Sequence, residues 1–401
     1  MNTTIPMKAE PGFTNHNADN RTYSSADKAA GKMSAPQFAQ RLSRFRYQMV
    51  QAGQDAALVF SPVNLRYLFN YSGEALMAIV SPSAVVLVTD YRFIAQASQE
   101  APAELQLKCY CRDRDRESLA QVIAAHLLQF KARRVWFEDS DISVLQWRAI
   151  CEGNGLIEFS PCPPHLAAQR MVKDEWEVVQ IEQAAAIADL ALERALPLLQ
   201  VGVSEREFAT ELEYQLKKAG AEDFSFATIL GFAERSALPH ALPGSKRLKK
   251  GDLIVLDFGA VVNGYRSDMT RSFVCGKASP LQQQMYNAVF NAQRAALDAV
   301  RAGISGAALN NIAADVLAAS PFAKDAGPGL GHGVGLQLHE QPFLGPLCRQ
   351  LLPENAVITI EPGIYITDFG GVRIEDDVLV TKEGCRILTK AAKQFELPER
   401  L

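Results

Sequence analysis

The spacing of apolar and polar residues divides the 401-residue chain into three stretches. Residues 1–33 are rich in Asn, Thr, Ser, Ala and Gly with almost no large apolar side chains, which predicts a disordered tail. In residues 34–165, short apolar runs alternate with helical spacings, a pattern typical of an α/β domain. In residues 172–396, long amphipathic helices alternate with strands that carry unusual polar residues. We expect the functional site in this last stretch.

The first domain is predicted to begin with a helix that Ser34 caps and Gly53 ends. Its apolar face is formed by residues at helical spacing, namely Phe38, Leu42, Phe45 and Met49. Short apolar runs then predict strands, and the patterns between them predict helices. The strands are expected at 56–60, 76–80, 84–88, 105–109 and 134–137, and the helices at 91–99, 116–130 and 142–151. The proline-rich segment 160–164 is interpreted as a linker.

The second domain is predicted to open with two helices, at 173–199 and 204–220. Ser204 and Glu207 have the spacing of a capping box at the start of the second helix. Two further helices fit residues 280–302 and 305–319.

The composition of the chain mainly excludes certain classes of protein. The 41 Lys and Arg residues against 45 Asp and Glu give a net charge of −4, which does not favour a nucleic-acid or anionic-membrane partner. No apolar run reaches the roughly 18 residues of a membrane span, and no signal peptide is visible, so we expect a cytoplasmic protein. The seven cysteines are scattered and odd in number, which argues against a disulfide framework.

The strongest functional signal is a pair of aspartates in a predicted β-hairpin. Asp257 lies in a buried-strand sequence, where aspartate is uncommon, and an Asn-Gly turn at 263–264 sends the chain back through Asp268. This register places the two carboxylates diagonally on one face, about 7 Å apart or less at Cβ. Two like charges at this distance favour a metal ion between them. The alternative is a pair neutralised by a neighbouring arginine, Arg266 or Arg271.

A second pair of acids has a similar arrangement. The predicted strand at 356–361 ends with Glu361, and the chain turns near Asp368 and returns through Glu375. Both glutamates are seven residues from Asp368, so a return strand brings them together unless a bulge shifts the register. Acids at strand ends are common, and this pair taken alone leaves metal binding and a structural role equally open.

Between the two hairpins, glycines recur at every second position from Gly327 to Gly335. The segment lacks the Lys-Ser/Thr of a phosphate-binding P-loop, so we favour a backbone that approaches a site closely and presents His332. His339 follows seven residues later. Four carboxylates and one imidazole form a hard ligand set that suits two divalent ions. Mn²⁺ is the expected metal, with Zn²⁺, Co²⁺ and Fe²⁺ as alternatives.

Taken together, these motifs resemble those of the Xaa-Pro peptidases, aminopeptidase P and prolidase, in the creatinase-like metallopeptidase family M24. The resemblance rests on segments 256–260, 264–271, 331–335, 339–340, 361–363 and 373–377, and less specifically on 67–68 and 88–92. It implies an α/β N-terminal domain of creatinase type at 34–165. It also implies an α+β C-terminal catalytic domain with the pita-bread fold at 172–396.

The resemblance further implies a role for each site residue. Two divalent ions would be held by five ligands, namely Asp257, Asp268, His332, Glu361 and Glu375. Asp268 and Glu375 would bridge the ions, and Glu361 would also manage the proton of the attacking water. His240 would contact the substrate near the scissile bond, His339 would hold the substrate carbonyl and stabilise the tetrahedral intermediate, and Arg373 would support the site.

We therefore expect a cytoplasmic, homodimeric metallopeptidase that uses a metal-bridging hydroxide to remove the residue before proline from a free N-terminus. Its substrates would be small peptides with proline at the second position, with no nucleic-acid or membrane partner. Three alternatives stay open. They are an Xaa-Pro dipeptidase (prolidase), a metal-dependent non-peptidase hydrolase or lyase on the same fold, and a non-catalytic binding protein.

Overall fold

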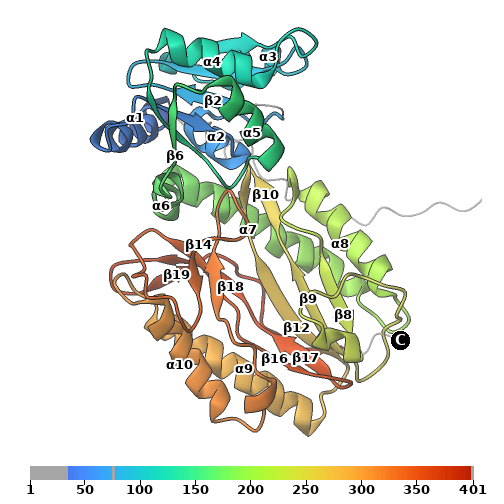
Figure 1. Cartoon of the computed structure of the whole chain (residues 1–401). Coiled ribbons are helices and arrows are strands. Elements are labelled where there is room, and N and C mark those ends of the chain that lie inside the picture. Colours follow the sequence, from blue (N-terminus) through green and yellow to red (C-terminus); the bar gives the residue numbers. More distant parts are fainter. Residues whose placement is uncertain (1–34, 75–76, 399–401) are drawn as a thin grey trace, which may run out of the picture. The chain divides into compact units, whose positions relative to one another are not determined.

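The computed structural model describes residues 35–74 and 77–398 (Figure 1). The predicted tail at 1–33 and the predicted cap at Ser34 lie outside the described residues. None of the described helices is both long and apolar enough to cross a membrane. No disulfide joins the cysteines of the described residues.

The N-terminal domain contains a six-stranded sheet with the order β4-β3-β2-β1-β5-β6. Its strands are β1 (Ala56–Val59), β2 (Met77–Val80), β3 (Val85–Thr89), β4 (Lys108–Cys111), β5 (Arg134–Phe137) and β6 (Glu158–Pro161). Its helices are α1 (Ala35–Gln51), α2 (Pro62–Phe69), α3 (Ile94–Glu100), α4 (Leu119–Gln129) and α5 (Val144–Gly153). Strands β1, β2 and β3 pair antiparallel, and the outer pairs are parallel. The α/β prediction for this stretch is therefore confirmed.

Two predictions in this domain are wrong in detail, and one helix was missed. The proposed linker at 160–164 starts within edge strand β6 and leads directly into helix α6 (His165–Met171). Strand β6 is only partly buried, so it lacks the apolar run that marks a core strand. Strand β4 starts at Lys108 because the segment 103–105 forms a 3₁₀ helix that ends at Gln106, with φ of 49°. Helix α2 was not predicted because eight residues are too few to show a helical period.

The C-terminal domain is built from four main helices and two sheets. The helices are α7 (Glu175–Ala195), α8 (Glu205–Ala219), α9 (Pro280–Ala299) and α10 (Gly306–Ala318). One sheet has the order β20-β12-β9-β8, with β8 (Ile229–Phe232), β9 (Leu253–Phe258), β12 (Met269–Cys275) and β20 (Glu396–Leu397). The other has the order β14-β13-β15-β18-β19, with β13 (Gly331–Gly333), β14 (Glu340–Leu344), β15 (Val357–Ile360), β18 (Asp376–Val380) and β19 (Cys385–Ile387).

Five shorter strands form two smaller sheets, one of three strands and one of two. They are β7 (Asp223–Phe224), β10 (Ala260–Val262), β11 (Tyr265–Arg266), β16 (Gly363–Ile366) and β17 (Gly370–Arg373). Ser204 and Glu207 form the predicted capping box at the start of α8, and Asp174 and Glu177 form another at α7. Each cap satisfies amide groups that the first turn of a helix leaves unpaired.

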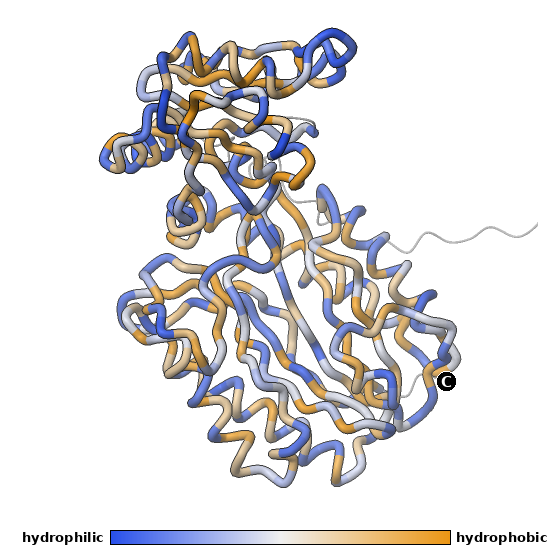
Figure 2. The backbone as a smooth tube through the Cα atoms, in the orientation of Figure 1, coloured by the Kyte–Doolittle hydropathy of each residue, from blue (hydrophilic) through white to orange (hydrophobic). Residues whose placement is uncertain are grey.

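Two hydrophobic cores hold the helix pairs against the sheets. Helices α9 and α10 pack on β15 and β18 through Met285, Val289, Leu309, Ile358 and Val378. Helices α7 and α8 pack on β8, β9 and β12 through a separate cluster that includes Leu192, Leu212, Leu230, Leu256 and Phe273. Figure 2 shows hydrophobic and hydrophilic positions alternating along α9 and α10, as expected for helices with one buried face. The α+β prediction for this stretch is confirmed.

Candidate metal centre

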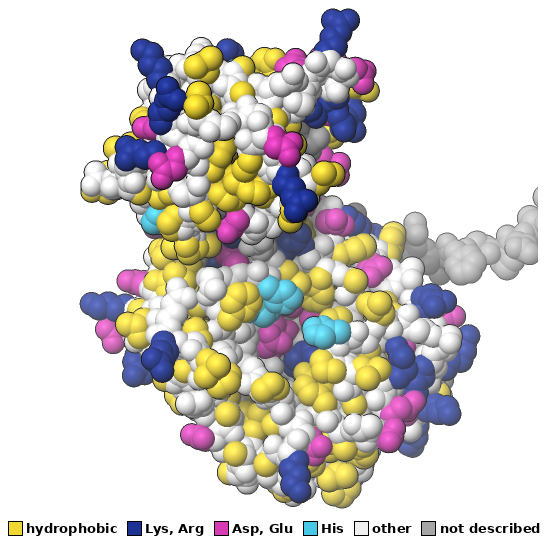
Figure 3. Space-filling model, in the orientation of Figure 1, with side chains coloured by type: hydrophobic (Ala, Val, Ile, Leu, Met, Phe, Trp, Pro, Cys, Tyr) yellow, Lys and Arg dark blue, Asp and Glu magenta, His cyan; other side chains and the backbone are white. Residues whose placement is uncertain are grey.

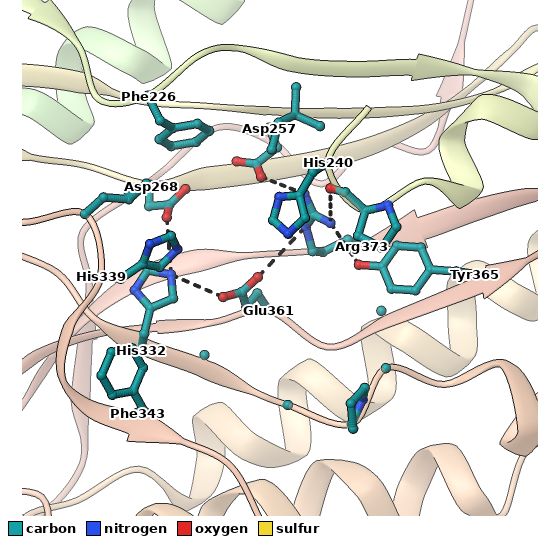
Figure 4. A pocket seen from close by; sticks show the side chains of 18 of the residues that line it. Phe226, His240, Asp257, Asp268, His332, His339, Phe343, Glu361, Tyr365 and Arg373 are labelled. Atoms are coloured by element: carbon teal, nitrogen blue, oxygen red, sulfur yellow. Dashed lines mark hydrogen bonds and ion pairs between the residues drawn. The ribbon is translucent and has the colours of Figure 1, made fainter. Parts of the chain in front are cut away.

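A cavity of about 570 Å³ lies between the strands of the C-terminal domain. Its lining includes most of the predicted site residues, namely His240, Asp257, Asp268, His332, His339, Glu361 and Arg373. Figure 3 shows histidine and acidic side chains gathered in a hollow of this domain. Figure 4 shows that they reach the cavity from strands on opposite sides.

The first hairpin places two carboxylates on one wall of this cavity. Asp257 on β9 pairs with Thr270 on β12, the register that a two-residue turn at 263–264 requires. Asp268 precedes β12, and its backbone N–H donates to Oδ2 of Asp377 at 2.8 Å. This bond fixes the backbone from which the Asp268 carboxylate projects. The predicted diagonal pair is therefore present on one face.

The second hairpin places two glutamates on the opposite wall. Ile360 on β15 pairs with Asp376 on β18, so Glu361 and Glu375 occupy the next opposed positions, symmetric about the turn at Asp368. The predicted register thus holds without a bulge. Thr270 Oγ1 in the first hairpin donates to Glu375 Oε2 at 2.6 Å and ties the two hairpins together.

The glycine-rich segment brings His332 close to these acids. A side chain at Gly331 would place its Cβ 2.2 Å from the Thr359 carbonyl oxygen, and one at Gly333 would approach the Gln341 carbonyl oxygen to 2.3 Å. Only glycine allows this approach, as the sequence predicts. The His332 Nδ1 lies 3.0 Å from the Gly333 carbonyl oxygen. Because a carbonyl only accepts, the proton sits on Nδ1 and Nε2 carries the lone pair.

The Nε2 lone pair of His332 points at the acids (Figure 4). It lies 3.5 Å from Asp268 Oδ2 and 3.4 Å from Glu361 Oε1. Ligand atoms of Asp268, His332 and Glu375 all lie within 4.8 Å of one another, close enough to share one ion. Three buried carboxylate oxygens in this cluster have no hydrogen-bond partner among the described residues: Asp257 Oδ1, Asp268 Oδ1 and Glu375 Oε1. Buried, unpaired carboxylate oxygens fit a divalent metal.

The arginine alternatives for the aspartate pair are not supported. Arg271 donates to Asp376 Oδ1 and to the Ala391 carbonyl, and Arg266 donates to the Ser225 carbonyl. The cation that meets Asp257 is Arg373, whose Nη2 lies 2.6 Å from Oδ2. This contact engages one oxygen of Asp257 and leaves the other unpaired.

Comparison with known families identifies this arrangement. Residues 179–382 match metallopeptidase family M24, and residues 41–172 match the creatinase/prolidase N-terminal domain. The chain belongs to metallopeptidase family M24. The protein is therefore a peptidase with a creatinase-type N-terminal domain and a pita-bread catalytic domain.

Solved structures at 32% identity to this chain carry different substrate names. An uncharacterized peptidase of Bacillus subtilis is 33% identical over 355 residues, which covers 88% of this chain and 99% of the relative. The structure of an Xaa-Pro dipeptidase from Bacillus anthracis superposes with a TM-score of 0.84 at 32% identity, covering 90% of this chain and all of that one. That of an X-Pro aminopeptidase from Thermotoga maritima gives 0.83 at 32% identity, covering 89% and 99%. Similarity alone leaves the preferred peptide length undecided.

Without a bound metal, burial and mutual repulsion favour protonation of the carboxyl groups of Asp268, Glu361 and Glu375. Burial, together with the neighbouring carboxylates, raises the pKa of Asp268 and of Glu375 well above the ordinary range. Burial raises the pKa of Glu361 to about 7 despite the nearby Arg373. Burial also lowers the pKa of His332, which keeps its imidazole neutral and able to bind a metal. Protons and a bound divalent ion would therefore compete for the same carboxylates.

The accessory histidines lie at the exposed mouth of the peptidase cavity. His240 and His339 are both exposed, and the His339 ring meets the His332 ring edge-on with centroids 4.3 Å apart. Partial burial, together with His332 and His240, lowers the pKa of His339. A neutral imidazole there can donate one hydrogen bond to a peptide carbonyl without bringing a second cation near the metal centre.

Several residues that shape the site were not predicted. The Tyr365 hydroxyl accepts a hydrogen bond from Arg373 Nη1 at 2.8 Å, and Phe226 and Phe343 form apolar parts of the wall. Asp377, which holds the Asp268 amide, is fully buried. The alternation of residues along β18 placed Asp377 on the same face as Glu375 and was the one available signal for it. The aromatic residues had no such signal.

Proposed function

We propose that this peptidase is an Xaa-Pro aminopeptidase that acts on peptides longer than two residues. The observation that carries the proposal is the charge of the cavity wall. Among the described lining residues, Arg373 is the only lysine or arginine, and its guanidinium makes four hydrogen bonds to other protein groups. Its bonds go to Asp257 Oδ2, Thr270 Oγ1, Tyr365 Oη and the Pro239 carbonyl.

A dipeptide substrate brings a free carboxylate close to its only peptide bond. The cavity offers that carboxylate no uncommitted guanidinium or ammonium group, and burying an unpaired charge is costly. A longer peptide has a neutral amide at the same place, which the apolar wall with Phe343 tolerates. The alternative function, an Xaa-Pro dipeptidase, is favoured by the name of the Bacillus anthracis relative.

In the proposed reaction, divalent ions would be held by Asp257, Asp268, His332, Glu361 and Glu375. When bound, divalent ions supply Lewis acidity and an activated water at neutral pH. We expect Mn²⁺, with Zn²⁺, Co²⁺ or Fe²⁺ as alternatives. We also propose that the enzyme is a cytoplasmic homodimer.

The chain's own residues handle protons and charge around the scissile bond. Glu361 can take the proton of the attacking water and return it to the leaving proline nitrogen. His339 and His240 at the cavity mouth can donate to the substrate carbonyl as negative charge develops on it. Arg373, held at four points, keeps the Asp257 side chain in place.

Three matched peptides test the proposal with Mn²⁺-loaded enzyme. They are an Xaa-Pro dipeptide, the same dipeptide as its C-terminal amide, and an Xaa-Pro-Xaa tripeptide. We expect the amide and the tripeptide to be cleaved with a higher kcat/KM than the free dipeptide, because only the dipeptide carries the carboxylate. A preference for the free dipeptide over its amide would establish the dipeptidase alternative. No cleavage with any of the four metals would refute both.

A further inference from the structure

Two buried cations hold the chain on either side of His339. Arg170 Nη2 donates to Gln337 Oε1 at 2.8 Å, and Lys173 Nζ donates to Glu340 Oε1 at 2.8 Å. Arg170 Nε also lies 3.4 Å from the second oxygen of Glu340. Leu338 and His339, between these two anchors, line the cavity. Arg170 lies at the end of helix α6, which contacts β14.

This ion cluster has little freedom to rearrange. The side chains of Arg170, Lys173 and Glu340 are 7%, 1% and 4% exposed. The Glu340 carboxylate also fills the space beside Gly335, where an added Cβ would lie 2.5 Å from Oε1. Loss of one partner would leave a buried charge unpaired, so the cluster favours a single arrangement.

The N-terminal domain sets the direction of the Arg170 side chain. Arg170 Nη1 donates to the side-chain oxygen of Asn64 in α2, and the Asn64 amide donates to Glu138. Glu138 in turn accepts the backbone N–H groups of Phe60 and Ser61, at 2.7 and 2.8 Å. A continuous series of hydrogen bonds therefore runs from the end of β1 to the segment that carries His339.

We propose that Arg170 is a positioning residue for His339, and that through it the N-terminal domain sets the turnover rate of the enzyme. Arg170 acts by holding Gln337 and Glu340 on both sides of the histidine. The role assigned to His339 rests on the proposed function. Arg170 itself does not line the catalytic cavity.

The chain contains a matched control for this residue. Arg41 is also a buried arginine that joins the N-terminal domain to the start of helix α7, through Asp174 at 2.8 Å and Glu177 at 2.9 Å. It has no contact with residues 337–340 among its hydrogen bonds and ion pairs. Arg41→Met and Arg170→Met should therefore lower stability in a similar way, but only Arg170→Met should affect His339.

We expect Arg170→Met to lower kcat by about 10- to 100-fold with bound metal unchanged and KM altered by about twofold at most. Arg41→Met should keep kcat within about twofold of the wild type when both are assayed well below their unfolding temperatures. Arg170→Lys should recover part of the loss, because it retains the charge beside Glu340 but lacks the fork that reaches Gln337. If Arg170→Met does not fold, Gln337→Ala removes one anchor with less disturbance and should also lower kcat.

A double-mutant cycle and a spectroscopic measurement test whether Arg170 positions His339. In a His339→Ala background, Arg170→Met should cause no further loss of kcat, since the residue that it positions is absent. In histidine side-chain NMR spectra, the His339 signal should shift in Arg170→Met and stay in place in Arg41→Met. Additive losses in the cycle, or an unshifted His339 signal, would overturn the proposal. The NMR result is independent of substrate, so a wild type inactive on every Xaa-Pro peptide would count against the proposed function alone.

Discussion

Replacement of Asp268 by asparagine should stabilise the metal-free protein and destabilise the metal-loaded one relative to the wild type. The substitution preserves shape and removes one negative charge from a buried cluster. Ligand atoms of Asp268 and Glu375 lie within 4.8 Å of each other. At an effective dielectric constant of about 20, two unit charges at that distance repel by about 3 kcal/mol. Because the raised pKa values of both acids mean that protons already relieve part of this repulsion, the gain should be smaller than the full repulsion of the two charges.

The metal-loaded protein should respond in the opposite sense. A neutral amide is a weaker ligand than a carboxylate and cannot bridge two cations in the same way. The wild type gains stability from bound ions according to their concentration and affinity, and Asp268→Asn should lose most of that gain. The order of stability of the two proteins therefore reverses when Mn²⁺ is added.

Urea unfolding near pH 8, with a chelator and with excess Mn²⁺, measures both effects, and metal analysis counts the bound ions. Asp189→Asn is a suitable control. That carboxylate accepts the backbone N–H groups of Lys390 and Ala391, at 2.8 and 2.7 Å. The control should therefore lose stability in both conditions and keep its metal.

Two results would refute this reasoning. A metal-free Asp268→Asn protein that is less stable than the wild type by more than about 1 kcal/mol would show that repulsion is not the dominant effect at this position. A variant that retains two ions and full peptidase activity would show that Asp268 is not a bridging ligand.

Three further predictions address other parts of the site. The metal-free protein should gain stability as the pH falls through about 7 toward 5. The buried Glu361 carboxyl has a pKa of about 7 and holds a proton that the unfolded chain releases in this range. Thermal unfolding with a chelator present measures this effect, and a stability that rises with pH would contradict it. Gly333→Ala should lose metal and about 1–3 kcal/mol of stability, because its Cβ would lie 2.3 Å from the Gln341 carbonyl oxygen. Gly329→Ala, with no neighbouring atom within 4 Å, should lose neither in the same urea and metal-binding titrations. Phe343→Arg places a cation on the cavity wall and should raise the rate on the dipeptide relative to the tripeptide, and an unchanged ratio would contradict the charge argument.

The hairpins of the metal centre could be predicted because turn chemistry fixes strand register. Once the Asn-Gly turn is assigned, the position opposite Asp257 follows from counting, and the structure has Thr270 there. The same holds for the turn at Asp368, which adopts a positive φ of 61° and opposes Glu361 to Glu375. Acidic residues within a predicted buried strand are also conspicuous in the sequence, because a carboxylate in a buried apolar run has few structural explanations.

The hydrogen-bond network around Arg170 could not be predicted, because no local sequence pattern fixes its geometry. Its partners are far apart in sequence, 106 residues for Asn64 and 170 for Glu340, and no turn or periodic pattern relates them. Lys and Glu usually lie at the solvated surface of a protein. Lys173 and Glu340 are buried here, where α6 packs on β14. Burial, in turn, makes their geometry specific, because an unpaired charge there is costly in every alternative arrangement. The contacts that sequence patterns fail to reveal are therefore the ones through which an accessory domain can influence a candidate metal centre whose residues all lie in another domain.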